Sequence, residues 1–174
     1  MEKSFSKLES KLSVINPKFV FEFSPVLENG KREFVLSADG HKDAFSDLIY
    51  LYVKSPFLKK WDFVLFKQGS DVEPTIKLEG DFTLSWEDVQ FEYKKTTAGL
   101  SFDFYIKGYT EGKEKIFGNA LIMLMDSYIG EYDAVMQTYS IGVHPLLDSD
   151  TSDYYKFKAL KNVVESYKRS KREE

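Results

Sequence analysis

The chain contains no cysteine, and only two of its 174 residues are histidines. A protein without cysteine can form no disulfide, has no thiol nucleophile and cannot build a zinc site from thiolates. His41 and His144 do not form a His-x-x-x-His pair, so the usual zinc patterns would need carboxylates to be complete. We therefore expect no metal site and no cofactor, and the composition permits a reducing compartment.

Long apolar runs and a strong excess of one charge are also missing. The longest apolar segment, ALIMLMDSYI, is interrupted by Asp126 and is about half of the ~20 residues that cross a bilayer. The N-terminal stretch mixes charges among its apolar residues, unlike a signal peptide. The net charge is −4, whereas broad nucleic-acid binding needs a dense positive face. We expect a soluble, cytoplasmic protein that binds neither membranes nor nucleic acid.

The glycines form none of the common loops that cradle phosphates. Neither G-x-G-x-x-G nor G-x-x-x-x-G-K-[ST] occurs, and there is no G-x-S-x-G nucleophile elbow. The basic C-terminal stretch YKRSKREE is short and ends in two glutamates, and its cations suit the end of a helix. The sequence therefore predicts no catalytic residue.

Apolar and aromatic residues, in contrast, are plentiful and regularly spaced. Hydrophobic residues make up 43% of the chain and aromatic residues 16%, which suffices for a full core in one domain spanning 1–174. Apolar spacing predicts a helix from Phe5 to Ile15, ended by Pro17. A last helix is expected to begin near Asp153 and to fray over residues 168–174.

One order of elements occurs twice between these helices. A hairpin with Asn29-Gly30 at its turn, a helix from about His41 to Lys54 and a strand fill residues 19–67. A second hairpin, a helix from about Lys113 to Ile129 and a strand fill residues 89–143. This pattern predicts an α+β fold in which two hairpin–helix–strand halves share one antiparallel sheet with helices packed on it. Chance similarity is the alternative to a true duplication.

The strand that closes the first half, KWDFVLFKQ, is apolar at nearly every residue. Trp61, Phe63 and Leu65 point to one side and Val64 and Phe66 to the other, so we expect a central strand covered on both faces. The polar segment that follows predicts one short strand around residues 76–78.

Two carboxylates, Glu131 and Asp133, directly follow the most apolar helix. Gly130 is placed to end that helix, which would put both acids at the negative end of the helix dipole. Solvation, a lysine or arginine from elsewhere, or a bound cation could offset this charge, and the first two are the usual outcomes for charged loop residues. A helix that continues past Gly130 through residues 134–137 would weaken the dipole argument.

His144 is close to these acids in sequence, and Pro145 holds its backbone extended. A strand running from Gln137 would carry the imidazole roughly 20 Å from the carboxylates. Proton transfer needs a separation of ~3 Å. We therefore predict that His144 does not act together with Glu131 and Asp133.

Three segments, FVLSADG, WDFVLF and GEYD, resemble a family of uncharacterised bacterial domains of unknown function. The resemblance covers about residues 19–146 and leaves both terminal helices outside. The family implies no activity. It does imply that Glu131, Tyr132 and Asp133 are the first candidate binding residues and that Asp39 is the next, and Asp39 is also placed to cap the helix after it.

Strong core patterns without a catalytic motif favour a non-enzymatic binding module whose partner is another protein. Two alternatives remain. The chain could be a hydrolase-type enzyme that uses a cation held by Glu131 and Asp133, or it could bind a small ligand in a pocket between sheet and helices, lined by Phe and Tyr.

Overall fold

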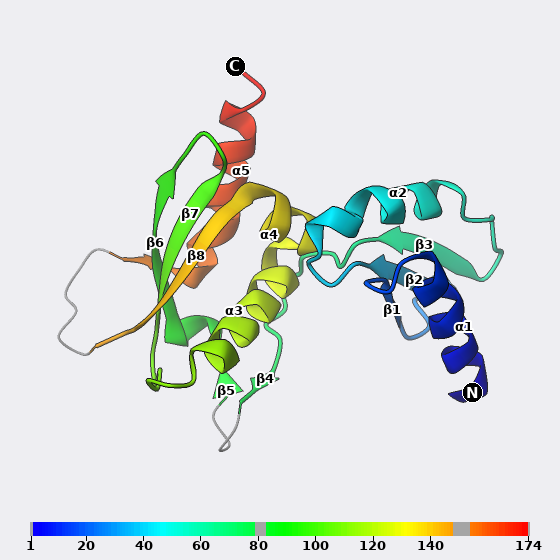
Figure 1. Cartoon of the computed structure of the whole chain (residues 1–174), viewed down its shortest axis with the longest axis horizontal. Helices are drawn as coiled ribbons and strands as arrows, with labels where there is room; N and C mark the ends of the chain where they lie inside the picture. The colour runs from blue at the N-terminus through cyan, green and yellow to red at the C-terminus, as the bar shows by residue number, and fades with distance from the viewer. Residues whose placement is uncertain (1, 79–82, 148–153, 174) are drawn as a thin grey trace. The chain divides into compact units, whose positions relative to one another are not determined.

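A computed structural model describes residues 2–78, 83–147 and 154–173 and divides the chain into two compact units, Met1–Lys67 and Gln68–Glu174 (Figure 1). The predicted α+β class is confirmed, with helices packed on mixed sheets. The described strands form separate three-stranded, two-stranded and four-stranded sheets, so the two halves do not share one antiparallel sheet. The single domain spanning 1–174 stays a prediction.

The first unit consists of two helices, a 3-10 turn and three strands. They are α1 Glu2–Ile15, β1 Val20–Phe23, β2 Arg32–Ser37, the turn Lys42–Ala44, α2 Phe45–Val53 and β3 Trp61–Leu65. The predicted hairpin is confirmed as β1 and β2, and Gly30 in its loop has a φ of 77° that glycine adopts without strain. The first helix ends before Pro17, as predicted.

β3 is an edge strand, which corrects the prediction that it lies centrally. The strand order is β1-β2-β3, in which β2 is antiparallel to β1 and parallel to β3, because α2 carries the chain back to the end where β2 began. All five β3 residues are half-buried rather than buried. Its apolar run arises because Trp61 and Phe63 pack beside the aromatic rings of β1 and β2, and not because helices cover both of its faces.

The second unit has two further short strands before its main sheet. Its elements are β4 Ile76–Lys77, β5 Thr83–Leu84, a 3-10 turn Trp86–Asp88, β6 Val89–Lys95, β7 Leu100–Ile106, α3 Glu114–Ile129, α4 Glu131–Gln137, β8 Thr138–Pro145, β9 Tyr155–Lys156, a 3-10 turn Phe157–Ala159 and α5 Leu160–Ser170. The sheet order is β8-β7-β6-β9, with β8 parallel to β7 and the other pairs antiparallel. The order hairpin–helix–strand therefore occurs in both units.

The main core lies between one face of this sheet and the helices α3 and α5. Along β7 the residues alternate strictly between buried and half-buried, as a strand with one covered face requires. The predicted apolar stripe of the last helix is buried as well, from Phe157 to Tyr167. Asp153, where that helix was expected to begin, lies outside the described residues. The helix continues through Ser170, and Lys168 makes ion pairs there, while the expected fraying over residues 168–174 stays a prediction.

Among the described residues, no helix has both the length and the apolarity needed to span a membrane.

Candidate functional site

The acidic corner after α3 is built around a sharp change of chain direction. Gly130 follows α3 with a φ of 87°, and α4 begins at the next residue. Glu131 and Asp133 therefore lie in the first turn of α4, where the helix dipole favours carboxylates. The chain does continue as a helix past Gly130. The helix dipole therefore gives no reason to expect a bound cation at this corner.

The three predicted binding residues of this corner point into different surroundings. Glu131 is completely buried, Tyr132 is exposed, and Asp133 lies in an ion pair. Asp133 Oδ2 accepts a hydrogen bond of 2.8 Å from Lys168 Nζ, and the same ammonium donates at 2.8 Å to Glu165 Oε1. The structure thus supplies the lysine from elsewhere that the sequence left open, and it joins α4 to α5.

These contacts shift the ionisation of the groups that make them. The hydrogen bond to Asp133, together with that to Glu165, raises the pKa of Lys168 above its ordinary value. The hydrogen bond from Lys168 lowers the pKa of Glu165. Within the described ranges, no three His, Asp or Glu side chains are grouped so that they could hold a metal ion. The geometry of the corner is that of a structural cross-link.

We expect Lys168→Met to lower the free energy of unfolding by about 1 kcal/mol at neutral pH, because two carboxylates lose a charged hydrogen-bond partner. The lowered pKa of Glu165 means that its contribution is present above pH 4.5 and is lost as the pH falls through the folded-state pKa. The raised pKa of Lys168 means that its contribution is present below pH 10.5 and is lost as the pH rises through the folded-state pKa.

The stability difference between wild type and Lys168→Met should therefore shrink at both ends of the pH range. Urea unfolding, followed by the fluorescence of the buried Trp86, measures this stability difference at each pH. Lys115→Met, which removes an exposed ammonium from α3, is the control and should change stability less. A difference that stays constant from acid to alkaline pH would contradict the assignment.

His144 lies near the end of β8, while both carboxylates precede that eight-residue strand. Its Nε2 is 2.9 Å from Oδ1 of Asp103, the residue that pairs with Gly142 across β7 and β8. A Cβ at Gly142 would collide with Asp103 Oδ1, so glycine leaves the space that this pair occupies. His144 is thus engaged away from Glu131 and Asp133, as the sequence predicted.

A short polar network surrounds this pair on the sheet face opposite the core. The ring of Tyr105 lies 5.3 Å from that of His144 and stacks at 4.0 Å on Tyr154. The Tyr105 hydroxyl donates to Glu92 Oε1 at 3.1 Å. Hydrogen bonding with Tyr154, burial and the Glu92 carboxylate together raise the pKa of Tyr105 strongly, so its hydroxyl stays protonated at neutral pH. The network ties the strands β6, β7 and β8 together.

Asp39 does not cap the following helix, which corrects the sequence prediction. His41 precedes the 3-10 turn and Ala44 precedes α2, and neither helical start has a side-chain cap. Asp39 instead adopts a φ of 49° and accepts a hydrogen bond of 3.0 Å from Lys67 Nζ. An aspartate tolerates this left-handed conformation better than most residues, which accounts for its place in the tight turn after β2.

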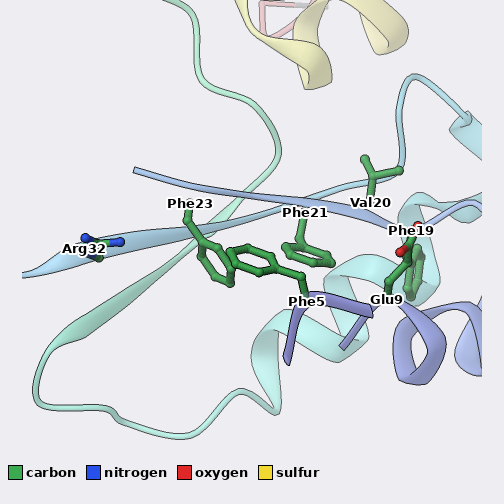
Figure 2. A pocket seen from close by; sticks show the side chains of 7 residues that line it. All are labelled: Phe5, Glu9, Phe19, Val20, Phe21, Phe23 and Arg32. Carbon is green, nitrogen blue, oxygen red and sulfur yellow. The ribbon is translucent and has the colours of Figure 1, made fainter. Parts of the chain in front are cut away.

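The first unit contains an open groove of about 560 Å³, which we call the β1 groove and take as the candidate binding site (Figure 2). It is lined by residues from α1, from β1 with the residue before it, and from the start of β2: Phe5, Glu9, Phe19, Val20, Phe21, Phe23 and Arg32. Phe5, Phe21 and Phe23 gather on one side of β1, and Val20 points to the other. The floor of the groove is therefore aromatic.

The aromatic floor is continuous with the apolar face of the sheet. Phe5 of α1 lies 6.2 Å from Phe21 and 5.3 Å from Phe23, measured between ring centroids. Phe23 in turn contacts Phe34 at 5.0 Å and Trp61 at 4.9 Å. These rings are half-buried, except that Phe5 is 40% exposed. The groove thus exposes apolar surface that its own unit covers only in part.

The two ends of the β1 groove carry opposite charges. Arg32 lies at the Phe23 end, with its guanidinium 6.0 Å from the Trp61 ring, and Glu9 lies beside Phe19 at the other end (Figure 2). From Phe19 to Phe23 the backbone extends about 13 Å at ~3.3 Å per residue. A bound molecule would meet a carboxylate, a row of rings and a guanidinium in that order.

The groove also follows an unpaired edge of the sheet. The backbone N–H of Ser24 donates to Glu33 O at 3.1 Å, so the even-numbered residues of β1 turn their backbone groups toward β2. Phe21 and Phe23 turn theirs away from β2, and β1 has no other strand neighbour among the described residues. Backbone donors and acceptors therefore face the groove beside the aromatic rings.

Sequence reasoning did not find this groove, although two of its signals were present. The alternation of Phe19, Phe21 and Phe23 and the apolar stripe of α1 both pointed to a core. The missing information was that β1 is an edge strand and that α1 covers its rings only in part. Nothing in the sequence singled out Arg32 as a binding residue, because a single arginine beside a turn is common.

No family model matches this chain, and neither a curated protein nor a solved structure matches it. The resemblance to a family of bacterial domains therefore stays a prediction carried by FVLSADG, WDFVLF and GEYD.

Proposed function

We propose that the chain is a binding module that recognises an extended segment of a partner protein in the β1 groove. The observation that carries the proposal is an exposed edge strand beside a half-buried aromatic row with opposite charges at its ends. An extended peptide can pair with such an edge through its backbone and place alternate side chains in apolar pockets. The expected bacterial and cytoplasmic setting belongs to this proposal.

The charges favour one kind of segment. Apolar side chains at alternate positions would pack between Phe5, Phe21 and Phe23. A basic residue would reach Glu9 at one end, and an acidic residue would reach Arg32 at the other. Arginine forms two parallel hydrogen bonds with a carboxylate, so the Arg32 end should contribute most to specificity.

A small apolar ligand is the second candidate, because the groove volume lies within the range typical of small-molecule sites. Such sites usually enclose most of the ligand surface, whereas this groove is open along its length. The open side of the groove therefore favours an extended peptide segment over a small molecule as the ligand. The hydrolase alternative has no comparable support, since Asp133 is held by Lys168 and Glu131 is buried.

A defined library of extended peptides with alternating apolar residues, selected against the intact chain, tests the proposal. We expect Phe5→Ala and Arg32→Glu each to weaken a selected peptide about tenfold or more, as truncated anchor residues commonly do. The matched controls Phe57→Ala and Lys59→Glu change exposed residues of the same unit outside the groove and should leave affinity unchanged. The fluorescence of Trp61, which contacts Phe23, reports binding.

Hydrogen exchange distinguishes the two kinds of ligand. A peptide that adds a strand should protect the backbone amides of Phe21 and Phe23, whereas a small apolar molecule should perturb the rings alone. Failure of the library to yield any peptide that is sensitive to Phe5→Ala but not to Phe57→Ala would refute strand addition.

A further inference from the structure

The strand β8 forms one edge of the four-stranded sheet, and it lacks the charged side chains that commonly protect an edge. It is eight residues long, and among the described strands its only neighbour is β7. Residues 138–147, TYSIGVHPLL, include no lysine, arginine, aspartate or glutamate. Edge strands in soluble proteins are commonly guarded by charged side chains, especially lysine. An uncharged edge of this length is typical of a strand that pairs with another chain.

The backbone of β8 offers a short pairing window. The N–H of Leu146 donates to Ile106 O at 3.0 Å, so His144 and Gly142 also turn their backbone groups toward β7. Ile141 and Val143 therefore turn their N–H and C=O groups outward. Tyr139 is the extra residue of a β-bulge, and Pro145 has no N–H, so both ends of the window are closed. The window is residues 140–144, with Gly142 at its centre.

The side chains at this window are complementary to a copy of themselves. Ile141 pairs with Phe102 and Val143 with Phe104, so both point to the face that the helices cover. In an antiparallel pairing about Gly142, Ile141 of one copy lies opposite Val143 of the other. Ile141 is 37% exposed and the neighbouring Tyr139 is 64% exposed, and a second copy would cover this apolar surface.

On the opposite face of the window, the Asp103 carboxylate of each copy lies over its own Gly142 and is held by its own His144. Ser140 of one copy would lie opposite His144 of the other, while the His144 imidazole keeps its own Asp103 partner. Gly142 would meet Gly142 at the centre, where closely spaced backbones suit glycine. The helices α3 and α4 both contact β8, and they expose the apolar or aromatic side chains of Ile122, Met123 and Tyr132.

We infer that β8 of one copy pairs antiparallel with β8 of a second copy about a twofold axis at Gly142. The pairing forms about four backbone hydrogen bonds through the outward groups of Ile141 and Val143. It joins two four-stranded sheets into one continuous sheet. A twofold interface requires one patch to be complementary to itself, and an uncharged strand with apolar residues placed symmetrically about a glycine meets that requirement.

Sedimentation of the full chain over a wide concentration range tests the dimer. We expect a monomer–dimer equilibrium in which Ile141→Lys raises the dissociation constant about tenfold or more, because an ammonium would be placed against Val143 of the partner. Val72→Lys, at a more exposed apolar position of the same unit, should leave the dissociation constant unchanged. A wild type that stays monomeric, or a dimer that is indifferent to Ile141→Lys, overturns the inference.

Cross-linking tests the register and does not depend on how Ile141→Lys folds. The chain has no natural cysteine, so an Ile141→Cys chain and a Val143→Cys chain each carry one thiol. Opposed residues in this pairing have Cα atoms about 5.5 Å apart, within the range of a disulfide. Oxidation should link the mixed chains faster than either chain alone. Equal rates would overturn the register about Gly142. Phe5→Ala should leave the dimer intact, so this inference and the peptide proposal fail separately.

Discussion

We expect Phe104→Ala to lower the free energy of unfolding of the second unit by about 3–5 kcal/mol, a large part of the stability of a unit this size. Phe104 is fully buried in the centre of β7. Its ring lies 5.6 Å from Phe91, 5.5 Å from Phe102 and 6.4 Å from Phe157. Removing it leaves a cavity whose walls belong to two strands and a helical turn, and these cannot collapse together.

The matched substitution in the first unit, Phe63→Ala, should cost only about 1–2 kcal/mol. Phe63 is half-buried, and its ring centroid lies 5.2 Å from that of Phe34. Water already reaches the site, so less apolar area is lost and no closed cavity forms. The comparison separates a closed core from an aromatic layer that is covered only in part.

Each unit contains one tryptophan, which allows the two unfolding transitions to be followed separately. Trp86 lies in the core of the second unit and Trp61 in β3 of the first. In a Trp61→Phe background, urea unfolding should show the large shift caused by Phe104→Ala, and a Trp86→Phe background should show the smaller shift caused by Phe63→Ala. Equal shifts would contradict the difference in packing. Transitions that move together in wild type would support the single domain spanning 1–174.

The second large effect is expected from Gly69→Ala, which should destabilise the second unit by about 2–3 kcal/mol. A Cβ at Gly69 would lie 2.5 Å from Tyr128 O, 2.8 Å from Ile129 C and 2.9 Å from Gly130 N. All three are backbone atoms at the end of α3, so a side-chain rotation cannot relieve the overlap. The segment is held there by the N–H of Ser70, which donates to Ser127 O at 2.8 Å.

Gly118→Ala is the control with the opposite expected sign. Gly118 lies inside α3, and a Cβ there would meet no atom within 4 Å. Alanine restricts the unfolded chain more than glycine does, so this change should stabilise the unit by about 0.5–1 kcal/mol. Urea midpoints read from Trp86 emission measure both variants. A neutral Gly69→Ala would show that the close approach of the chain to Gly130 does not constrain the fold.

Elements that depend on local sequence were largely predictable. Alternation from Phe19 to Phe23 with a turn at Gly30 indicated the first hairpin, and the stripe of the last helix identified residues that are indeed buried. The order of the strands in each sheet was not predictable, because the spacing of apolar residues along the sequence does not determine which strands pair. The edge position of β3 and the parallel pairing of β8 with β7 follow from where the intervening helices return the chain.

The contacts of the candidate site also depend on residues that are far apart in the sequence, which local patterns do not reveal. Asp133 stood out because acids cluster around it, yet its partner Lys168 is 35 residues away and is brought near by the packing of α5. Asp103 was not singled out, since its contact with His144 spans 41 residues and depends on the register of two strands. Asp39 was expected to cap a helix from residue type alone, and its left-handed backbone directs it elsewhere.

The parallel pairs β2–β3 and β7–β8 have a consequence for how the chain reaches its native state. A hairpin closes over a few residues, whereas each of these pairs must close a loop that includes a whole helix. The entropy lost on forming such long-range contacts slows folding relative to hairpins and helices. The docking of β3 and of β8 therefore carries a larger chain-ordering cost than the closure of either hairpin, and until they dock, β2 and β7 each keep one edge unpaired.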